Sequence, residues 1–380
     1  MTSPATITEK ILSRIEGRAV RAGEIIYPEP ELVTVHDWYV VNFDKALTAL
    51  GVDRVFDPSK IIISTDHEPL AVSPHAAERQ KKVREIVRKY GITQFRDVGR
   101  SGLGHIFPIE EGLVRPGMFV EAYDVHVTNF GAIGVLALPF VIEVSEILAL
   151  GSVWVKVPET VRVDLVGKLR PGTLIRDVAQ KLIRDLGDEL VDYSVVEFGG
   201  EALAGLGIEE RQILCNTPID IGAKSALVEP DEVVRAYVSA RTDQPFDLVR
   251  SDPDADFKAR ITYDLSLIEP QVAVPPTPDS VVGIVEVVGR SVQHAFVGSC
   301  ASGNLPELRA AASVLRGRTI HPDVRLFITP ATQTVAREAA AEGLMEVFYS
   351  SGATVTVPGC GPCAGGRIGP MAPGETSINT

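Results

Sequence analysis

The chain has few cysteines, a deficit of basic side chains and no long uninterrupted apolar run. Four cysteines in 380 residues are too few for a disulfide framework, so the thiols are available for metal. Lysine and arginine total 37 against 50 acidic residues, and the net charge of −13 argues against a nucleic-acid-binding face. The most apolar stretch, residues 131–151, contains Pro139, Glu143 and Glu146, so it predicts a buried helix and not a membrane span.

The N-terminal sequence MTSPATITEK lacks the charged and apolar regions of a secretory signal. We therefore expect a cytoplasmic protein whose thiols stay reduced. The length of 380 residues and the 45% hydrophobic content are typical of two or three globular domains.

Short apolar runs alternate with helical patterns along the chain, which predicts an α/β fold. Strands are expected at 61–64 and 324–328, for example, with helices at 76–90 and 332–342 after them. Four prolines in 269–280 predict a stiff, extended connector. With a weaker boundary near 156–160, the expected domains are 1–155, 156–270 and 281–380.

Three of the cysteines lie near the C-terminus in glycine-rich surroundings. Cys300 is in VGSCASGN, and Cys360 and Cys363 form a C-x₂-C pair in PGCGPCAGG. Three thiolates suit a cubane iron–sulfur cluster in which one iron keeps an open position and acts as a Lewis acid. A zinc site is the alternative; it needs a fourth ligand, for which Cys215 is the remaining cysteine. Inert thiols are a third possibility, and spacing alone does not decide among them.

Several histidines stand at expected strand ends or loop tips, most of them beside an aspartate. They are found in His36-Asp37, Asp66-His67, Gly104-His105 and Asp124-Val125-His126. A carboxylate next to an imidazole fixes its tautomer and raises its basicity, as proton transfer requires. The glycines of GRSGLGH do not have dinucleotide-binding spacing, so we expect a tight loop there in which Arg100 can clamp a carboxylate. A solvated turn or a capping aspartate is the ordinary alternative for any one pair.

These motifs together resemble the aconitase superfamily, in particular the large subunit of the 3-isopropylmalate dehydratase and homoaconitase group. The resemblance extends from about residue 7 to residue 380. It is strongest in FVGSCASGN, PGCGPCAG and PGET, and it is supported by TDH, GHIFP, WVKVPET and ILCNTPIDIGAK.

The resemblance implies an aconitase-like fold of three α/β domains around a cleft that holds a [4Fe–4S] cluster on Cys300, Cys360 and Cys363. It implies a hydro-lyase of amino-acid biosynthesis that acts on a small hydroxy-di- or tricarboxylate, such as isopropylmalate or homocitrate. A separate small swivel-domain subunit would complete the site with a serine base. The implied catalytic residues are Asp66, His67, His105, Asp124 and His126, and the implied substrate-binding residues are Arg100, Thr128 and Ser299. A non-catalytic, cluster-bearing relative that acts through a partner is the alternative.

Two departures from the family pattern bear on the substrate. Val125 stands where the family has a serine between the aspartate and the histidine, and a buried carboxylate that loses this donor would lose about 1–3 kcal/mol of binding. The sequence ends at Asn379-Thr380, before the family's usual SNRNF segment, whose arginine clamps a substrate carboxylate. The first departure predicts a substrate choice that differs from that of typical members. The second leaves three alternatives open, namely a truncated sequence, a natural fragment or a degenerate paralogue.

Overall fold

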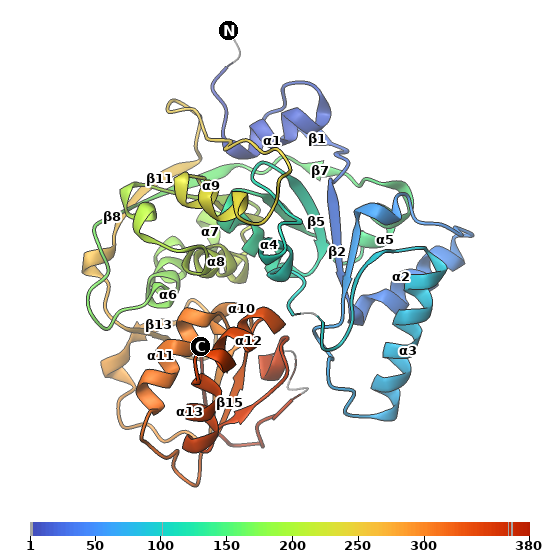
Figure 1. Cartoon of the computed structure of the whole chain (residues 1–380). Coiled ribbons are helices and arrows are strands. Elements are labelled where there is room, and N and C mark those ends of the chain that lie inside the picture. The colour runs from blue at the N-terminus through green and yellow to red at the C-terminus, as the bar shows by residue number, and fades with distance from the viewer. Residues whose placement is uncertain (1–2, 101, 364, 366–367) are drawn as a thin grey trace. The chain divides into compact units, whose positions relative to one another are not determined.

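The computed structural model describes residues 3–100, 102–363, 365 and 368–380 (Figure 1). The chain divides into two compact units, each built from two separate segments. Unit 1 comprises Met1–Val33 and Pro108–Val288, and unit 2 comprises Thr34–Phe107 and Gly289–Thr380. The α/β class expected from the sequence is confirmed, because helices alternate with parallel strands in both units. The division into three domains stays a prediction.

The C-terminal segment of unit 2 is a parallel four-stranded sheet with helices packed on it. Its strand order is β16-β15-β14-β17, and every pair is parallel. Leu308, Ile328 and Phe348 are completely buried and join the helices to the sheet. The elements are β14 (His294–Gly298), α10 (Ser299–Ser302), α11 (Leu305–Leu315), β15 (Arg325–Thr329), α12 (Gln333–Ala341), α13 (Leu344–Ser351), β16 (Thr354–Val355) and β17 (Ser377–Asn379).

The N-terminal segment of unit 2 supplies three neighbouring strands in the order β4-β3-β2. Two helices accompany them and pack together through Phe43 and Tyr90, whose ring centroids are 5.8 Å apart. Ser73 caps the second helix, since its hydroxyl accepts the N–H of Ala76. The elements are β2 (Leu32–His36), α2 (Asp37–Ala49), β3 (Ile61–Ser64), α3 (Pro74–Lys89) and β4 (Gln94–Arg96).

Unit 1 contains a second parallel sheet with the order β10-β9-β8-β11. Its core is aliphatic, with Val163, Val196 and Ala226 of the strands buried against Val178 and Leu214 of the helices. A parallel pair, β5 and β6, also belongs to this unit. The main elements are α1 (Ile7–Glu16), β5 (Phe119–Tyr123), η2 (Val125–Ile133), β8 (Thr160–Val166), α6 (Ile175–Leu186), β9 (Val195–Gly199), α8 (Ile208–Asn216), η4 (Pro218–Ile221), β10 (Ser225–Val228), α9 (Glu232–Ser239) and β11 (Ala259–Asp264).

The expectation of one buried helix over residues 131–151 is wrong, although most of the stretch is buried. It contains the end of η2, the strand β6 (Leu136–Pro139) and the helix α5 (Val144–Leu150). Gly134 has a φ of 77°, which turns the chain after η2, and Pro139 closes β6 because it has no N–H for a further ladder bond. No helix among the described residues combines the length and apolar character needed to cross a bilayer.

The proline-rich segment 269–280 is not the stiff, extended connector that was expected, because turns at 275–276 and 278–279 reverse the chain within it. It leads from β12 (Gln271–Ala273) to β13 (Val281–Gly283), and the two strands pair in antiparallel fashion. Each of the two strands covers one edge of the other. The Gln271 N–H also donates to Asp177 Oδ1 at 2.8 Å, and this bond ties the segment to α6.

Gly131 allows η2 to approach β10 closely, so a side chain at this position is expected to destabilise the protein. A Cβ atom there would lie 2.0 Å from the Ala226 carbonyl oxygen and 2.7 Å from the Leu227 Cα. The added methyl group would force the backbone of β10 to shift, which costs free energy. Gly131→Ala should therefore lower the free energy of unfolding by about 1–3 kcal/mol, measured by urea denaturation. In Gly205→Ala the new methyl meets nothing within 4 Å. That variant should stay within about 0.5 kcal/mol of the parent, and an equal loss in both would contradict this account of Gly131.

Candidate active site

The cysteines lie on two loops that follow strands of the unit 2 sheet. Cys300 is in α10, directly after β14, and Cys360 and Cys363 are in a loop after β16. Cys300 and Cys360 are buried and pack with Leu103, Ile106 and Ala331, whereas Cys363 is exposed. None of the three forms a disulfide bond within the part of the chain that the structure describes. Cys300 lies where the strand β14 passes into the helix α10.

Close backbone packing explains the glycines beside these cysteines. A Cβ on Gly361 would lie 2.4 Å from Thr329 Oγ1, and one on Gly359 would lie 2.4 Å from the carbonyl oxygen of Asp66. Ser299 has a φ of 54°, a left-handed conformation that a residue with a side chain rarely adopts. Such strain is often found at functional sites, and here it turns the chain from β14 into α10 immediately before Cys300.

Asp66 is the most connected side chain of this region. It is completely buried at the end of β3. One carboxylate oxygen lies 2.8 Å from His67 Nδ1, and the other accepts the Gly104 N–H at 2.7 Å and the Ser64 hydroxyl at 3.1 Å. Its carbonyl oxygen accepts the Cys360 N–H at 3.0 Å. One residue thus joins the His67, Gly104–His105 and Cys360 loops.

The charge of Asp66 determines which nitrogen of His67 carries a proton. Burial raises the pKa of Asp66, but the His67 imidazole and the hydrogen bonds outweigh it and leave the pKa below its ordinary value. The ionised carboxylate accepts, so the proton of His67 lies on Nδ1. Nε2 is then the ring atom that lies 3.5 Å from Cys360 Sγ. His67 is in this way aimed at a cysteine 293 residues away in the sequence.

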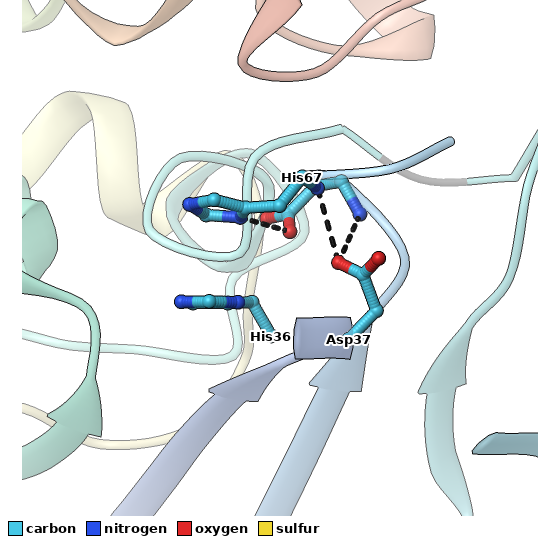
Figure 2. A group of neighbouring side chains, drawn as sticks. His36, Asp37 and His67 are labelled. Atoms are coloured by element: carbon cyan, nitrogen blue, oxygen red, sulfur yellow. Dashed lines mark hydrogen bonds and ion pairs between the residues drawn. The ribbon is translucent and has the colours of Figure 1, made fainter. Parts of the chain in front are cut away.

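Figure 2 shows that His36 and Asp37 lie beside His67. The rings of His36 and His67 are stacked, with centroids 3.6 Å apart. Burial, followed by the charge of Asp66, raises the pKa of Asp37 to about 7. The sequence placed the His36-Asp37 pair at a strand end but did not connect it to His67, because nothing in the pattern says that two strand ends meet.

The other expected residues of unit 2 differ in exposure. His105 is buried and follows Gly104, and the nearby N–H of Leu103 donates to the Ala331 carbonyl at 3.0 Å. Ser299 is buried next to Cys300. Arg100 is exposed, and its main-chain N–H donates to Asp97 O at 3.0 Å. The roles given to these three residues stay predictions.

Asp124, His126 and Thr128 belong to unit 1. Asp124 caps η2, because its Oδ1 accepts the His126 N–H at 2.8 Å. His126 Nε2 lies 3.8 Å from Asp220 Oδ1, and Asp220 was missed in the sequence because its segment, η4, is about ninety positions away. Thr128 is completely buried, and Val125 is 44% exposed between Asp124 and His126. An apolar side chain thus faces solvent where the family has a hydroxyl.

A buried glutamate lies on β5, three residues before Asp124. Glu121 is completely buried, and among the described residues neither carboxyl oxygen has a hydrogen-bond partner. Burial raises the pKa of Glu121 well above its ordinary value of 4.5, and the charge of Lys224 opposes this only partly. Lys224 Nζ donates instead to the Pro139 carbonyl at 2.7 Å. The Glu121 carboxyl group is therefore protonated to a higher pH than an exposed one.

The arrangement of donors indicates which metal group the cysteines fit. The residues that the structure describes contain one group of at least three metal-binding side chains with ligand atoms within 4.8 Å of one another, and it comprises His36, Asp37, Asp66 and His67. None of the three cysteines belongs to that group. They lie instead after β14 and β16, and each thiolate of a cubane cluster binds a different iron. Three such thiols can therefore hold three irons of a cluster, whereas a zinc site needs a fourth ligand.

The parallel sheets, with thiol, imidazole and carboxylate groups at their strand ends, are typical of an α/β enzyme. Comparison with known proteins gives the family. The model of the Aconitase family (aconitate hydratase) matches residues 42–380. The chain belongs to the aconitase family, and the expectation of an aconitase-type hydro-lyase is confirmed.

Named relatives extend over almost the whole chain. It is similar to 3-isopropylmalate dehydratase large subunit 1 of Methanopyrus kandleri, with 39% identity over 99% of this chain and 90% of that protein. The 3-isopropylmalate dehydratase large subunit of Heliobacterium modesticaldum is 37% identical over the same shares. Among solved structures, aconitase X of Thermococcus kodakaraensis has a TM-score of 0.52 with 16% identity, and the match covers 93% of this chain and 84% of that one. This last likeness supports the aconitase-like fold alone.

The protonated state of Glu121 predicts a pH-dependent stability. In the unfolded chain this carboxyl group ionises near pH 4.5, but in the folded chain it ionises only at higher pH. Stability therefore falls as the pH rises between these two values. Glu121→Gln does not titrate, so the free energy of unfolding of the variant should gain on that of the parent as the pH rises above about 4.5.

Urea denaturation across that pH range measures the difference. Glu189→Gln, at an exposed position of α7 (Asp188–Val191), corrects for the loss of one acidic residue. A constant difference between Glu121→Gln and the parent at every pH would show that Glu121 ionises as an exposed glutamate does.

Proposed function

We propose that this chain is the large subunit of a hydro-lyase that acts on a small hydroxy-di- or tricarboxylate, such as isopropylmalate or homocitrate, in amino-acid biosynthesis. The named relatives support this substrate class, since eight 3-isopropylmalate dehydratase large subunits are 35–39% identical over 99% of this chain. The observation that carries the proposal is the contact of Cys360 with the Asp66-His67 pair through both its N–H and its sulfur.

Cys300, Cys360 and Cys363 would hold a [4Fe–4S] cluster. The lack of disulfide bonds at these cysteines in the described residues, and the close-packed glycines beside Cys360, support this ligand set. When bound, such a cluster supplies a Lewis acid for the hydroxyl and carboxylate oxygens of the substrate.

In unit 2, His67 would transfer a proton near the cysteines. Asp66 keeps the Nδ1 proton of His67 in place, so Nε2 is the atom that can accept or release a proton. The Gly104 N–H bond to the same carboxylate holds the loop that carries His105. Ser299 and Arg100 would bind substrate carboxylates.

The side chains of unit 1 would contribute a second proton-transfer group and part of the substrate wall. Asp124 orients the start of η2 and therefore His126, whose Nε2 faces the Asp220 carboxylate. Thr128, which is completely buried on η2, would be the substrate-binding residue of this unit. The exposed Val125 offers an apolar contact where a hydroxyl donor is usual, which favours an apolar group at that point of the substrate.

A small swivel-domain subunit would complete the enzyme, as the name "large subunit" of the relatives implies. The test is to produce the chain together with such a subunit under anaerobic conditions, and to measure iron, sulfide and the hydration or dehydration of isopropylmalate, homocitrate and citrate. We expect about four irons per chain, as in a cubane cluster, and turnover of at least one of these acids. A complex that carries the full cluster and turns over none of them would favour the non-catalytic alternative.

Removal of one thiol should remove the cluster and the activity together. Cys360→Ser replaces a thiolate by a hydroxyl, a poor ligand for iron, in a loop that also contacts His67. We expect the iron content and the hydro-lyase rate to fall to background. Cys215→Ala is the matched control, because Cys215 is a buried core residue of α8 in unit 1. Full turnover by Cys360→Ser would refute the ligand assignment.

His126→Ala should separate catalysis from cluster binding. His126 lies on η2 in unit 1, and the cysteines lie in unit 2. Because removal of a general acid or base costs about 10²- to 10⁴-fold in rate, we expect kcat to fall by that factor with the iron content unchanged. Colorimetric iron analysis and steady-state kinetics on one preparation measure both. Loss of iron with His126→Ala would make the role of His126 structural.

A further inference from the structure

The tripeptide His36-Asp37-Trp38 has no role in the function proposed so far, yet it surrounds His67. It lies at the junction of β2 and α2 in unit 2, and His36 and Asp37 are buried. The contacts of this tripeptide are of two kinds. The Asp37 carboxylate accepts main-chain N–H groups, and the rings of His36 and Trp38 contact the His67 ring.

Asp37 fixes the main chain of the His67 loop. Its Oδ1 accepts the N–H groups of Asp66 at 3.3 Å and His67 at 3.0 Å. Its Oδ2 accepts the N–H of Glu68 at 3.1 Å. From the opposite side, Gln80 of α3 donates to the carbonyls of Glu68 and Pro69 at 2.9 and 3.2 Å. The backbone around His67 is thus fixed in two ways: Asp37 binds its N–H groups, and Gln80 binds its carbonyl groups.

His36 fixes the ring itself. Its imidazole covers one face of the His67 imidazole, with a centroid distance of 3.6 Å and an interplanar angle of 16° (Figure 2). Trp38 approaches the same ring at a tilt, with centroids 5.0 Å apart. The Asp66 bond to Nδ1 limits sliding within the ring plane, and the His36 face limits rotation out of it. The two restraints together set the direction of Nε2.

A divalent cation is the obvious alternative for this group, since its four ligand atoms lie within 4.8 Å of one another. Both carboxylates are already occupied, because Asp37 accepts three N–H groups, and Asp66 accepts from His67, Gly104 and Ser64. A cation would have to displace these bonds. Stacked imidazoles also present their faces to each other and not their nitrogen lone pairs. The two carboxylates are therefore satisfied by hydrogen bonds from the protein.

We propose that His36 is a positioning residue: its ring is the support that keeps His67 Nε2 aimed at the cysteine loop. The part of this inference that concerns turnover rests on the proposed function. His36 acts through His67, so the flat ring is what matters and not the nitrogens of His36.

The kinetic test compares His36→Ala with His36→Phe in the complex of the chain with its small subunit, with the cluster loaded. Loss of the support should lower kcat by about 10- to 100-fold, as does loss of other groups that orient a reacting side chain. KM and the iron content should not change. Phenylalanine restores a flat face, so His36→Phe should recover most of the rate. His321, which is 71% exposed in unit 2, gives the matched controls His321→Ala and His321→Phe.

A spectroscopic test is independent of turnover. Nitrogen-15 NMR of histidine-labelled chain without its partner, at about pH 8 where an ordinary imidazole is neutral, reports the tautomer of His67. His67→Asn identifies the His67 signals. We expect the parent and His36→Phe to show the Nδ1-protonated form alone. In His36→Ala the ring can rotate away from Asp66, so the Nε2-protonated form should appear as well.

The outcomes separate this inference from the proposed function. If the parent complex turns over no hydroxy acid, the proposed function fails, and the NMR comparison alone decides the role of His36. Unchanged His67 signals in His36→Ala would overturn the positioning role. So would a loss of rate in His36→Phe equal to that in His36→Ala, because it would assign the effect to the nitrogens of His36.

Discussion

The structure depends on one buried carboxylate. Asp66 lies at the end of β3 with no exposed surface, so each of its oxygens must be satisfied from within the protein. His67, Gly104 and Ser64 do this for the side chain, and Cys360 binds the carbonyl. An unpaired buried charge costs free energy, so the hydrogen bonds to Asp66 keep the three loops in fixed positions relative to one another. The position of the imidazole and of the cysteine sulfur follows from that requirement.

Much of this region was predictable from local pattern. The apolar run 61–64, the cysteine spacing and the helix over 332–342 are each encoded within a dozen residues, and the structure has the strand and the helix nearly where expected. Polar residues at strand ends were also expected to matter, because parallel strands end at a common edge. The α/β class followed from the alternation of these elements, the aconitase-like fold was implied by the family resemblance, and the comparisons bear both out.

What the sequence did not predict depends on contacts between distant segments. Residues 131–151 are apolar throughout, so their pattern could not distinguish one buried helix from the strand and helix that Gly134 and Pro139 separate. The bonds from Asp37 to the His67 loop join residues about thirty positions apart, and Asp220 approaches His126 from another helix. Such partners are chosen by tertiary packing, which leaves no local signature.

Each unit is assembled from two stretches of chain, and this has a consequence for biogenesis. The loop that bears Asp66 is synthesised early, but the thiols that complete its surroundings follow only after the whole intervening portion of unit 1. A ribosome-bound intermediate would therefore present the Asp66 carbonyl and the His67 ring before their partner Cys360 has been synthesised. Any metal group held by the three cysteines can be inserted only after both stretches of unit 2 have been synthesised, so it cannot be loaded onto the first stretch alone.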